Sequence, residues 1–383
     1  MHRLMAGVTI LEHELSELRL LVERQTGILL DCPNSALAAH VAEYLESQEL
    51  ESSAALMDRL RASDQDPSVL PTFLDGVLNV DTGFFRHPGA LNALARQVIP
   101  QLYARKSDDG FCTLRIWSAG CSTGEEAYSI AMALCEALPA GNGNSNGAST
   151  GNGKEKSVTA RNGGIAESAV PASGESMKDW SIHIVGSDLL PSAIGVAERG
   201  LYPQSALTGL PPAAIRACFS KIGSASGGQN GSQDASQNSN STGSTGNGAT
   251  SNRSLNNGSA RNGSAQGSAN DSPNGTTGPT NGAHLLVKPR LRSLVTFNTM
   301  NLTKPVYIGR FDCIFCMDVL PHLSRVQRTA LLERLHLYLE PGGYLFLSQT
   351  EKLCAPNLNF RPETFDGYTF HRKPLAASAA YGR

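Results

Sequence analysis

The chain has 383 residues and a formal net charge of −2 at pH 7, and hydrophobic residues make up 40% of it. This near-neutral balance, without a long basic run, argues against a nucleic-acid-binding protein. No apolar run approaches the roughly 18 residues of a membrane-spanning helix, and the eight cysteines are scattered rather than spaced as a disulfide framework. We therefore expect a cytoplasmic protein with reduced thiols that is not embedded in a membrane.

Helical periodicity dominates the N-terminal residues 1–78. Leu15, Leu18 and Leu21 recur at the spacing of one helix face, and Gly27 and Pro33 interrupt the pattern. Several such segments follow one another, so the pattern predicts a small N-terminal all-α domain.

The segment DTGFFRHP at 81–88 follows this domain. The adjacent Phe84 and Phe85 are expected to pack between the helical domain and the next domain. Arg86 has two open interpretations. It is either a residue near an element end with no ligand, or a fixed guanidinium that grips a carboxylate.

The most informative stretch starts with the apolar run Leu114–Trp117, turns through Gly120 and Gly124, and continues as a helical pattern. Strand, glycine loop and helix in this order build the nucleotide pocket of an open α/β sheet. The loop lacks the phosphate-binding glycine patterns, and Glu125 and Glu126 stand where a pyrophosphate would lie. A phosphate-free cofactor with hydroxyls and a positive charge, such as S-adenosylmethionine, suits this loop. The alternative is an ordinary strand–helix turn that binds nothing.

A second buried strand is predicted at 180–188, and it ends in Asp188. In nucleotide-binding sheets an acid at this position binds the ribose hydroxyls. Asp188 is therefore a candidate for that contact, and the alternative is a cap on the helix that follows at Pro191.

Further strands are expected near 284–288, 295–298, 311–316 and 344–348, with a long amphipathic helix that Ser324 caps. Cys313 and Cys316 have a metal-binding spacing, but they lie inside one of these strands. We interpret them as core cysteines and predict no metal site.

Two stretches, about 141–177 and 223–282, consist mainly of small and polar residues. Such segments cannot bury enough apolar surface to offset chain entropy, so they are predicted to be disordered inserts. The remaining residues suffice for one α/β domain at 79–374 beside the helical domain. The tail at 375–383 is also expected to be disordered.

These landmarks, in this order, resemble the chemotaxis-receptor methyltransferase family known as CheR. The resemblance covers nearly all of the chain outside the inserts, up to about Lys373. The segments that carry it are Thr82–Arg86, Trp117–Glu126, Ser187–Asp188, Ala197–Tyr202, Asn301–Leu302, Phe311–Cys316 and Pro341–Leu347 with Glu351. It implies an α/β fold of the S-adenosylmethionine-dependent methyltransferase (Rossmann-like) class, with the N-terminal all-α domain. It also implies a small antiparallel β-subdomain at about 203–297 that contains the second insert.

The resemblance also implies a cofactor site. Thr82 and Arg86 would approach the methionine end of the cofactor, Glu125 would lie near it in the glycine loop, and Asp188 would hold the ribose. The full set of implied cofactor-binding residues is Thr82, Arg86, Gly120, Glu125, Asp188, Asn301, Leu302, Met317 and Asp318.

Two candidate catalytic residues follow from the same resemblance. Arg86 would orient charge near the reacting end, and His322 stands where the family brings a tyrosine near the transferred methyl group. The other interpretation of His322 is a surface residue at a helix entry.

The sequence departs from the family pattern in several places. Val80 replaces an asparagine, Met317 and Asp318 replace an Arg-Asn pair, and a helix that is basic in the family reads NSALAAH at 34–40. Val80, Met317 and Asp318 belong to segments close to the implied site, whereas the helix at 34–40 concerns docking to the receptor.

The implied activity is that of a monomeric protein-glutamate O-methyltransferase, which methylates glutamate carboxylates in an acidic helical segment of a chemoreceptor-like protein. Two alternatives remain: a cofactor-binding signalling protein with weakened catalysis, and a methyltransferase with a different substrate.

Overall fold

The computed structural model describes residues 10–62, 66, 68–78, 81–108, 113–137, 180–222, 283–305, 308–353, 355 and 357–375. The predictions for the two inserts, for the tail after residue 375 and for Val80 lie outside these residues.

The N-terminal part is helical, as predicted. It contains α1 (Glu12–Thr26), α2 (Asn34–Ser47), α3 (Ser53–Arg61) and α4 (Val69–Asp75). The periodic leucines of the sequence form its core, together with aromatic residues from α2 and α4. The fully buried members are Val22, Leu37, Leu60, Phe73 and Leu74.

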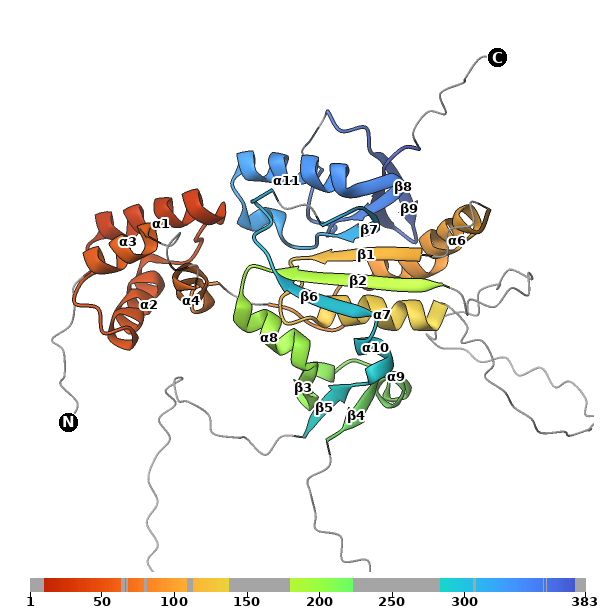
Figure 1. The fold of residues 1–383 in the computed structure, drawn as a ribbon, viewed down its shortest axis with the longest axis horizontal. Coiled ribbons are helices and arrows are strands. Elements are labelled where there is room, and N and C mark those ends of the chain that lie inside the picture. The colour runs from red at the N-terminus through yellow and green to blue at the C-terminus, as the bar shows by residue number, and fades with distance from the viewer. Residues whose placement is uncertain are drawn as a thin grey trace, which may run out of the picture. The chain divides into compact units, whose positions relative to one another are not determined.

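A seven-stranded sheet forms the centre of the α/β part (Figure 1). Its strands, in spatial order, are β6 (Val295–Thr299), β2 (Ser181–Asp188), β1 (Thr113–Ala119), β7 (Phe311–Phe315), β8 (Leu339–Phe346), β10 (Tyr368–Arg372) and β9 (Arg361–Phe365). The first five are parallel to one another, and β10 pairs antiparallel with both β8 and β9. The predicted mixed α/β class is therefore confirmed.

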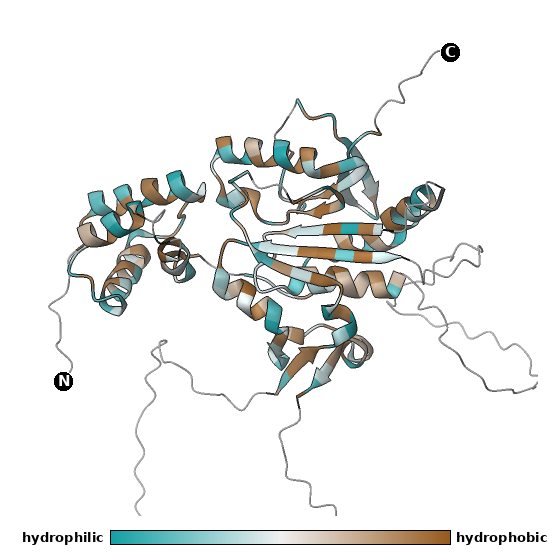
Figure 2. Cartoon of the chain, in the orientation of Figure 1, coloured by the Kyte–Doolittle hydropathy of each residue, from teal (hydrophilic) through white to brown (hydrophobic). Residues whose placement is uncertain are grey.

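Helices cover both faces of this sheet, because parallel strands need crossover connections. The helices are α5 (Pro88–Ala93), α6 (Ile99–Asp108), α7 (Glu125–Ala137), α8 (Pro191–Arg199) and α11 (Arg325–Tyr338), with a π-helical turn at Leu94–Val98 between α5 and α6. Alternate side chains of β1 point to opposite layers. Ile116 joins a core cluster with α7, and Trp117 joins a separate cluster with α11. Figure 2 shows the hydrophobic and hydrophilic bands that follow from this packing along the helices.

A small antiparallel sheet is present, as predicted, in the order β3 (Leu201–Pro203), β5 (His284–Val287), β4 (Phe219–Lys221). Short helices flank it at Gln204–Leu207, at α9 (Pro212–Cys218) and at α10 (Pro289–Arg292). Residues 295–297, at the end of the predicted β-subdomain, belong to β6 of the large sheet.

The packing of Phe84 differs from the expectation. Its ring lies edge-on against Tyr202 and Phe219, with centroid distances of 4.9 and 5.4 Å, so it contacts the small sheet and not the helical core. Cys313 and Cys316 are fully buried free thiols, as expected for core cysteines. None of the described helices has the length and apolar character needed to cross a membrane.

A buried ion pair ties α6 to the sheet. Asp312, whose side chain is 2% exposed, accepts hydrogen bonds from Lys106 Nζ at 2.7 Å and from the backbone N–H of Arg115 at 2.9 Å. We expect Lys106→Met to lower the free energy of unfolding by about 2 kcal/mol, because it leaves a buried carboxylate without its cation. Urea unfolding measures this change. Arg61→Met, which removes an exposed pair, should change stability by less than about 1 kcal/mol. If both substitutions lower the free energy of unfolding equally, the buried Lys106–Asp312 pair is not a special source of stability.

Candidate functional site

A cavity of about 460 Å³ lies at the carboxyl ends of the parallel strands. The segments that follow β1, β2, β6 and β7 contribute 120–122, 188–190, 300–303 and 317–319 to its wall. Residues 81–87 and the end of α1 complete it. Ligands of open α/β sheets bind at this edge, and the volume is in the range of small-molecule sites.

All but one of the residues predicted for the site line this cavity. They are Thr82, Arg86, Gly120, Asp188, Asn301, Leu302, Met317, Asp318 and His322. Glu125 is not among the lining residues, and its carboxylate accepts a hydrogen bond from Thr123 Oγ1 at 2.7 Å. Burial raises the pKa of Glu125, although hydrogen bonds from Thr123 and Thr82 act in the opposite direction. The next residue, Glu126, lines the cavity instead.

The glycine loop forms the floor between β1 and α7. Gly120 has φ +87°, and a Cβ atom there would lie 2.5 Å from Val319 Cγ2, so only glycine fits without a shift. Ser122 follows with φ +50°, and its buried Oγ has no hydrogen-bond partner among the described residues. An unpaired buried hydroxyl costs about 1–3 kcal/mol. This one lines the cavity, where a ligand hydroxyl or amine can satisfy it.

We expect Gly120→Ala to weaken binding of S-adenosylhomocysteine at least tenfold, because the new methyl group would push Val319 in the cavity wall. Calorimetry measures the affinity. Gly209→Ala is the matched control, because Gly209 also has a positive φ of +98°, but a Cβ atom there would meet no other atom within 4 Å. Both substitutions should strain the backbone, by about 1 kcal/mol. If both weaken binding equally, the effect is not local to the cavity.

Asp188 joins the ends of β1 and β2. Its Oδ2 accepts a hydrogen bond from Ser122 N at 2.9 Å, and its Oδ1 accepts one from Leu190 N at 3.1 Å. It does not cap α8 from the N-cap position, which Leu190 occupies. Burial raises the pKa of Asp188, and the backbone N–H groups oppose this shift. Each carboxylate oxygen still has acceptor capacity for a ligand hydroxyl.

Glu126 is the acid that the sequence analysis did not select. Ser118 Oγ donates a hydrogen bond to its Oε1 at 2.6 Å. Burial, reinforced by the negative charges of Asp318 and Glu351, raises the pKa of Glu126 to about 7. Ser129, three residues further along α7, also lines the cavity. Glu125 also lies at a same-face spacing, four residues before Ser129, so helical spacing alone does not identify which of the two glutamates lines the cavity.

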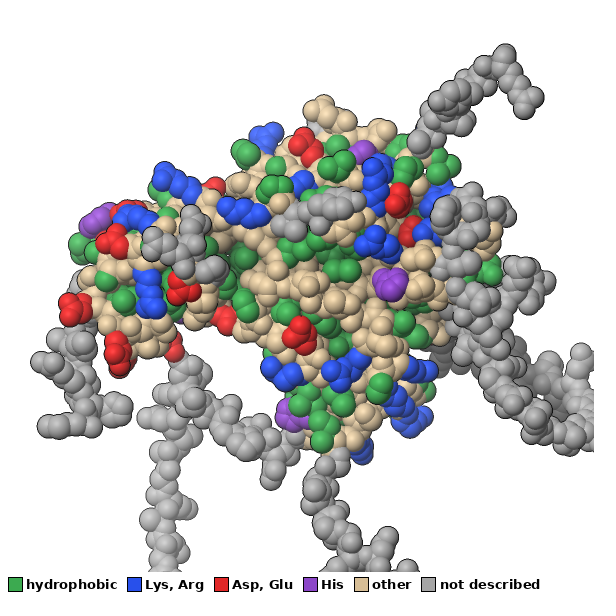
Figure 3. All heavy atoms as spheres, in the orientation of Figure 1, with side chains coloured by type: hydrophobic (Ala, Val, Ile, Leu, Met, Phe, Trp, Pro, Cys, Tyr) green, Lys and Arg blue, Asp and Glu red, His purple; other side chains and the backbone are tan. Residues whose placement is uncertain are grey.

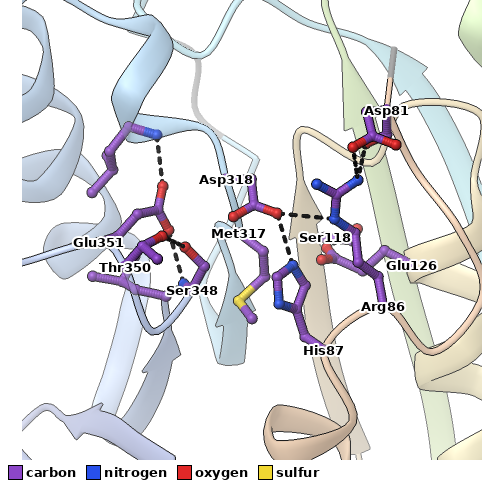
Figure 4. Close-up of polar contacts among 12 residues, drawn as sticks. Asp81, Arg86, His87, Ser118, Glu126, Met317, Asp318, Ser348, Thr350 and Glu351 are labelled. Carbon is purple, nitrogen blue, oxygen red and sulfur yellow. Dashed lines mark hydrogen bonds and ion pairs between the residues drawn. The ribbon is translucent and has the colours of Figure 1, made fainter.

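Asp318 contacts both Arg86 and His87 (Figure 4). Its Oδ2 lies 3.2 Å from Arg86 Nε and 2.9 Å from His87 Nε2, and Arg86 NH1 also lies 2.9 Å from Asp81 Oδ2. Arg86 therefore grips carboxylates, as one interpretation proposed, but both belong to its own chain. His87 was not identified from the sequence. Phe85 and Asp318 have φ values of 55° and 58°, and such strained backbone concentrates at functional sites.

The charged residues that line the cavity indicate which kind of ligand it can bind. Among the described residues of the wall, four carboxyl groups face one guanidinium and two imidazoles: Asp81, Glu126, Asp188 and Asp318 against Arg86, His87 and His322. A negative cavity favours a cationic ligand. The unpaired Ser122 hydroxyl and the Asp188 carboxylate suit hydroxyl and amine groups. The carboxyl groups and the unpaired hydroxyl of the wall thus fit a nucleoside that carries a sulfonium ion.

Sequence comparisons identify a family and relatives to which the chain is similar. Residues 80–170 and 276–368 match the family model described as "CheR methyltransferase, SAM binding domain". The chain is 25% identical to chemotaxis protein methyltransferase 1 of Pseudomonas aeruginosa over 357 residues, which cover 90% of this chain and 95% of that protein. It is 23% identical to chemotaxis protein methyltransferase 1 of Vibrio cholerae over 355 residues, or 92% and 93% of the two chains.

Solved structures with a similar arrangement include magnesium protoporphyrin IX methyltransferase from Synechocystis PCC 6803 with bound S-adenosylmethionine. The TM-score is 0.25 at 12% identity, and the match covers 76% of this chain and 85% of that chain. The glycopeptide N-methyltransferase MtfA in complex with S-adenosylhomocysteine matches with a TM-score of 0.23 at 10% identity, over 72% and 59% of the two chains.

Proposed function

The chain belongs to the CheR family of S-adenosylmethionine-binding methyltransferases, and from this premise we propose that it methylates glutamate carboxylates of a chemoreceptor-like protein. The observation that carries the proposal is the similarity to chemotaxis protein methyltransferases along nearly the full length of both chains. The cavity supports it, because five of the seven segments that match the family pattern contribute residues to its wall.

The chain's own residues have three tasks in such a reaction: they bind the nucleoside, compensate the positive charge of the cofactor and exclude water. S-adenosylmethionine supplies a methyl group on a positively charged sulfur. Asp188 and the unpaired hydroxyl of Ser122 provide acceptors and a donor for the nucleoside, and the buried Glu126 carboxyl compensates positive charge. Apolar side chains of the wall, such as Leu302 and Met317, exclude water from the cavity. This matters because water would stabilise the attacking carboxylate.

Arg86 acts at the reacting end. Its guanidinium is held between Asp81 and Asp318, so its orientation is set before any ligand binds. Pre-oriented cations align reactants without reorganisation during the reaction. We propose that Arg86 aligns the incoming carboxylate with the methyl group, and that His322 lies beside them in the wall.

A basic surface supports an acidic protein partner. The described segments 199–222 and 283–305 contain basic residues but no Asp or Glu. Figure 3 shows blue side chains gathered over the small sheet and its helices. The exposed members are Arg199, Arg216, Lys221, Arg290, Arg292 and Lys304. Since α2 lacks the basic residues of the family pattern, we propose that this surface supplies the attraction for an acidic receptor segment.

The pocket substitutions favour a second candidate, a cofactor-binding signalling protein with weakened catalysis. Met317 removes one cation that the family pattern has beside the reacting end, and Asp318 adds a negative charge that binds Arg86. A binding protein of this kind would hold the cofactor but transfer no methyl group.

One assay separates the two candidates. The protein is incubated with methyl-labelled S-adenosylmethionine and a cytoplasmic chemoreceptor fragment, and alkali-labile label is measured in the fragment. Glutamate methylation produces methyl esters, which alkali releases as methanol. Binding of S-adenosylhomocysteine by calorimetry without such label would reject methylation of the chemoreceptor. Label in a different protein of a cell lysate would then indicate a methyltransferase with another substrate, and no label there would favour the second candidate.

A further inference from the structure

Glu351 is a half-buried acid beside the cavity wall, and the proposed function assigns it no role. It lies in the segment that follows β8, and it is not among the residues that line the cavity. No cation pairs with its carboxylate among the described residues. A carboxylate that leaves water needs compensation from hydrogen bonds, so the donors that it binds show which segments it holds together.

The carboxylate of Glu351 binds backbone N–H groups of two segments (Figure 4). Its Oε1 accepts a hydrogen bond from Leu320 N at 2.9 Å, and its Oε2 accepts one from Ser348 N at 2.8 Å. Burial raises the pKa of Glu351, and the backbone N–H groups of Ser348, Leu320 and Asp318 oppose this shift. Glu351 thus joins the segment after β8 to the segment after β7.

These hydrogen bonds fix the backbone around Asp318. This residue has a left-handed φ of 58°, and a residue other than glycine keeps such a conformation only where its surroundings determine it. Glu351 holds the N–H groups of Asp318 and Leu320. Between them, Val319 lies against Gly120, where a Cβ atom would not fit. The direction of the Asp318 side chain therefore depends on the carboxylate of Glu351.

The direction of this side chain matters because Asp318 holds Arg86. Its Oδ2 lies 3.2 Å from Arg86 Nε, and Asp81 Oδ2 lies 2.9 Å from Nη1 of the same guanidinium. Asp81 belongs to the same segment as Arg86, so Asp318 is the contact that ties the guanidinium to the segment after β7. The next step rests on the proposed function, in which Arg86 aligns the incoming carboxylate. Without the Asp318 contact the guanidinium would lose its fixed direction, and productive alignment would become less frequent.

We propose that Glu351 is a positioning residue for methyl transfer: it fixes the segment after β7 so that Asp318 holds Arg86 in the direction that aligns the acceptor. In the reaction the acceptor oxygen forms a bond to the methyl carbon, the methyl–sulfur bond breaks, and its electron pair stays on sulfur. No proton moves, because the acceptor carboxylate is ionised at neutral pH. Glu351 does not line the cavity, so it acts on the reaction through Asp318 and Arg86.

The test compares wild type with Glu351→Gln, Asp318→Ala and the double variant. Glutamine keeps the size of the side chain, but its amide N–H₂ group faces a backbone N–H, so one of the two segments loses its acceptor. Glu363→Gln is the matched control. Glu363 is also partly buried, with a side chain that is 24% exposed and lies 3.5 Å from Arg372, but it is in β9 and does not line the cavity.

Transfer to a cytoplasmic chemoreceptor fragment is measured at saturating S-adenosylmethionine. We expect Glu351→Gln and Asp318→Ala each to lower kcat about tenfold. The double variant should be at most about threefold slower than either single variant, because both changes remove the same contact with Arg86. In Glu351→Gln, KM for the fragment and the affinity for S-adenosylhomocysteine should change less than about threefold, and Glu363→Gln should match wild type. Losses that multiply to about 100-fold in the double variant, or an equal loss of S-adenosylhomocysteine affinity, would overturn the proposal.

Exchange of the Arg86 Nε–H proton with water, followed by NMR, provides a readout that does not depend on transfer. The hydrogen bond to Asp318 should protect this proton in wild type and in Glu363→Gln. Glu351→Gln and Asp318→Ala should both exchange it at least about tenfold faster. Unchanged protection in Glu351→Gln would overturn the proposal.

The outcomes separate this inference from the proposed function. Alkali-labile label at equal rates in wild type and Glu351→Gln would overturn the role of Glu351 and leave glutamate methylation intact. Loss of Arg86 protection in Glu351→Gln, in a protein that places no alkali-labile label in the fragment, would support the positioning and reject glutamate methylation.

Discussion

Glu126→Gln is expected to make the folded protein more stable than wild type at about pH 8, and the gain should vanish near pH 5. In the folded state the pKa of Glu126 is raised from 4.5 to about 7. Between these values the folded protein holds a proton that the unfolded chain releases. Wild-type stability therefore falls as pH rises through this range. Glutamine holds no proton and does not show this fall.

The expected size follows from the shift. A difference of one pKa unit corresponds to 1.36 kcal/mol, so the gain at about pH 8 is roughly 3 kcal/mol at most. Urea unfolding of both proteins at the two pH values measures it. Glu46→Gln, on the exposed face of α2, is the control and should show no pH-dependent difference. If Glu126→Gln changes the free energy of unfolding equally at both pH values, burial does not raise the pKa of this carboxyl.

The ionised Glu126 carboxyl destabilises the free protein, and under the proposed function its role is to bind a cationic cofactor. A bound cation would neutralise it, so Glu126→Gln should weaken binding of charged S-adenosylmethionine more than binding of neutral S-adenosylhomocysteine. Stability lost at a binding site in the free protein is a common cost of function. The same residue would then limit stability and favour the methyl donor over the product.

Much of the α/β part could be predicted because its signals are local. The apolar run at 114–117 and the glycines after it identified β1 and its loop, and Asp188 was correctly placed at the end of β2. Once two parallel strands were recognised, their carboxyl ends had to share one edge. The family resemblance placed residues far apart in the chain, such as Gly120 and Asn301, in one site, and both line one cavity.

The hairpin of β9 and β10 was not predicted, although a local signal for it exists. Asp366 and Gly367 connect the strands with φ values of 46° and 77°. Positive φ at both central residues is typical of a type I′ turn, which Asp-Gly favours. The flanking strands alternate less clearly than the central ones, and their burial is partial. The Asp-Gly pair therefore indicates this hairpin more clearly than the hydrophobic pattern of its two strands does.

Other features depend on tertiary contacts that no local pattern specifies. Adjacent glutamates look alike in sequence, and only the phase of α7 places Glu126 rather than Glu125 in the cavity. The pairing of His87 with Asp318 joins segments 231 positions apart. Phe84 was expected to pack between the helical domain and the sheet domain, but its ring lies edge-on against Tyr202 and Phe219 of the small sheet.

Asp188→Ala is expected to weaken binding of S-adenosylhomocysteine about 100-fold. The substitution removes a buried carboxylate whose remaining acceptor capacity is proposed to bind ribose hydroxyls, and hydrogen bonds to charged groups contribute about 1.5–3 kcal/mol. It also removes the acceptor for Ser122 N, so part of the loss comes from the glycine loop. Calorimetry measures the affinity, and Asp58→Ala, an exposed residue of α3, is the control.

Asp188→Asn separates the two contributions. Asparagine keeps one carbonyl oxygen that can still accept from Ser122 N or Leu190 N, but it loses the negative charge and one acceptor. If direct ribose contact dominates, the asparagine variant should lose at least tenfold in affinity while its unfolding free energy stays within about 1 kcal/mol of wild type. If the loop dominates, affinity and stability should fall together only in the alanine variant. Affinity within threefold of wild type in both variants would show that the nucleoside does not contact Asp188, and the cofactor would then need another place in the cavity.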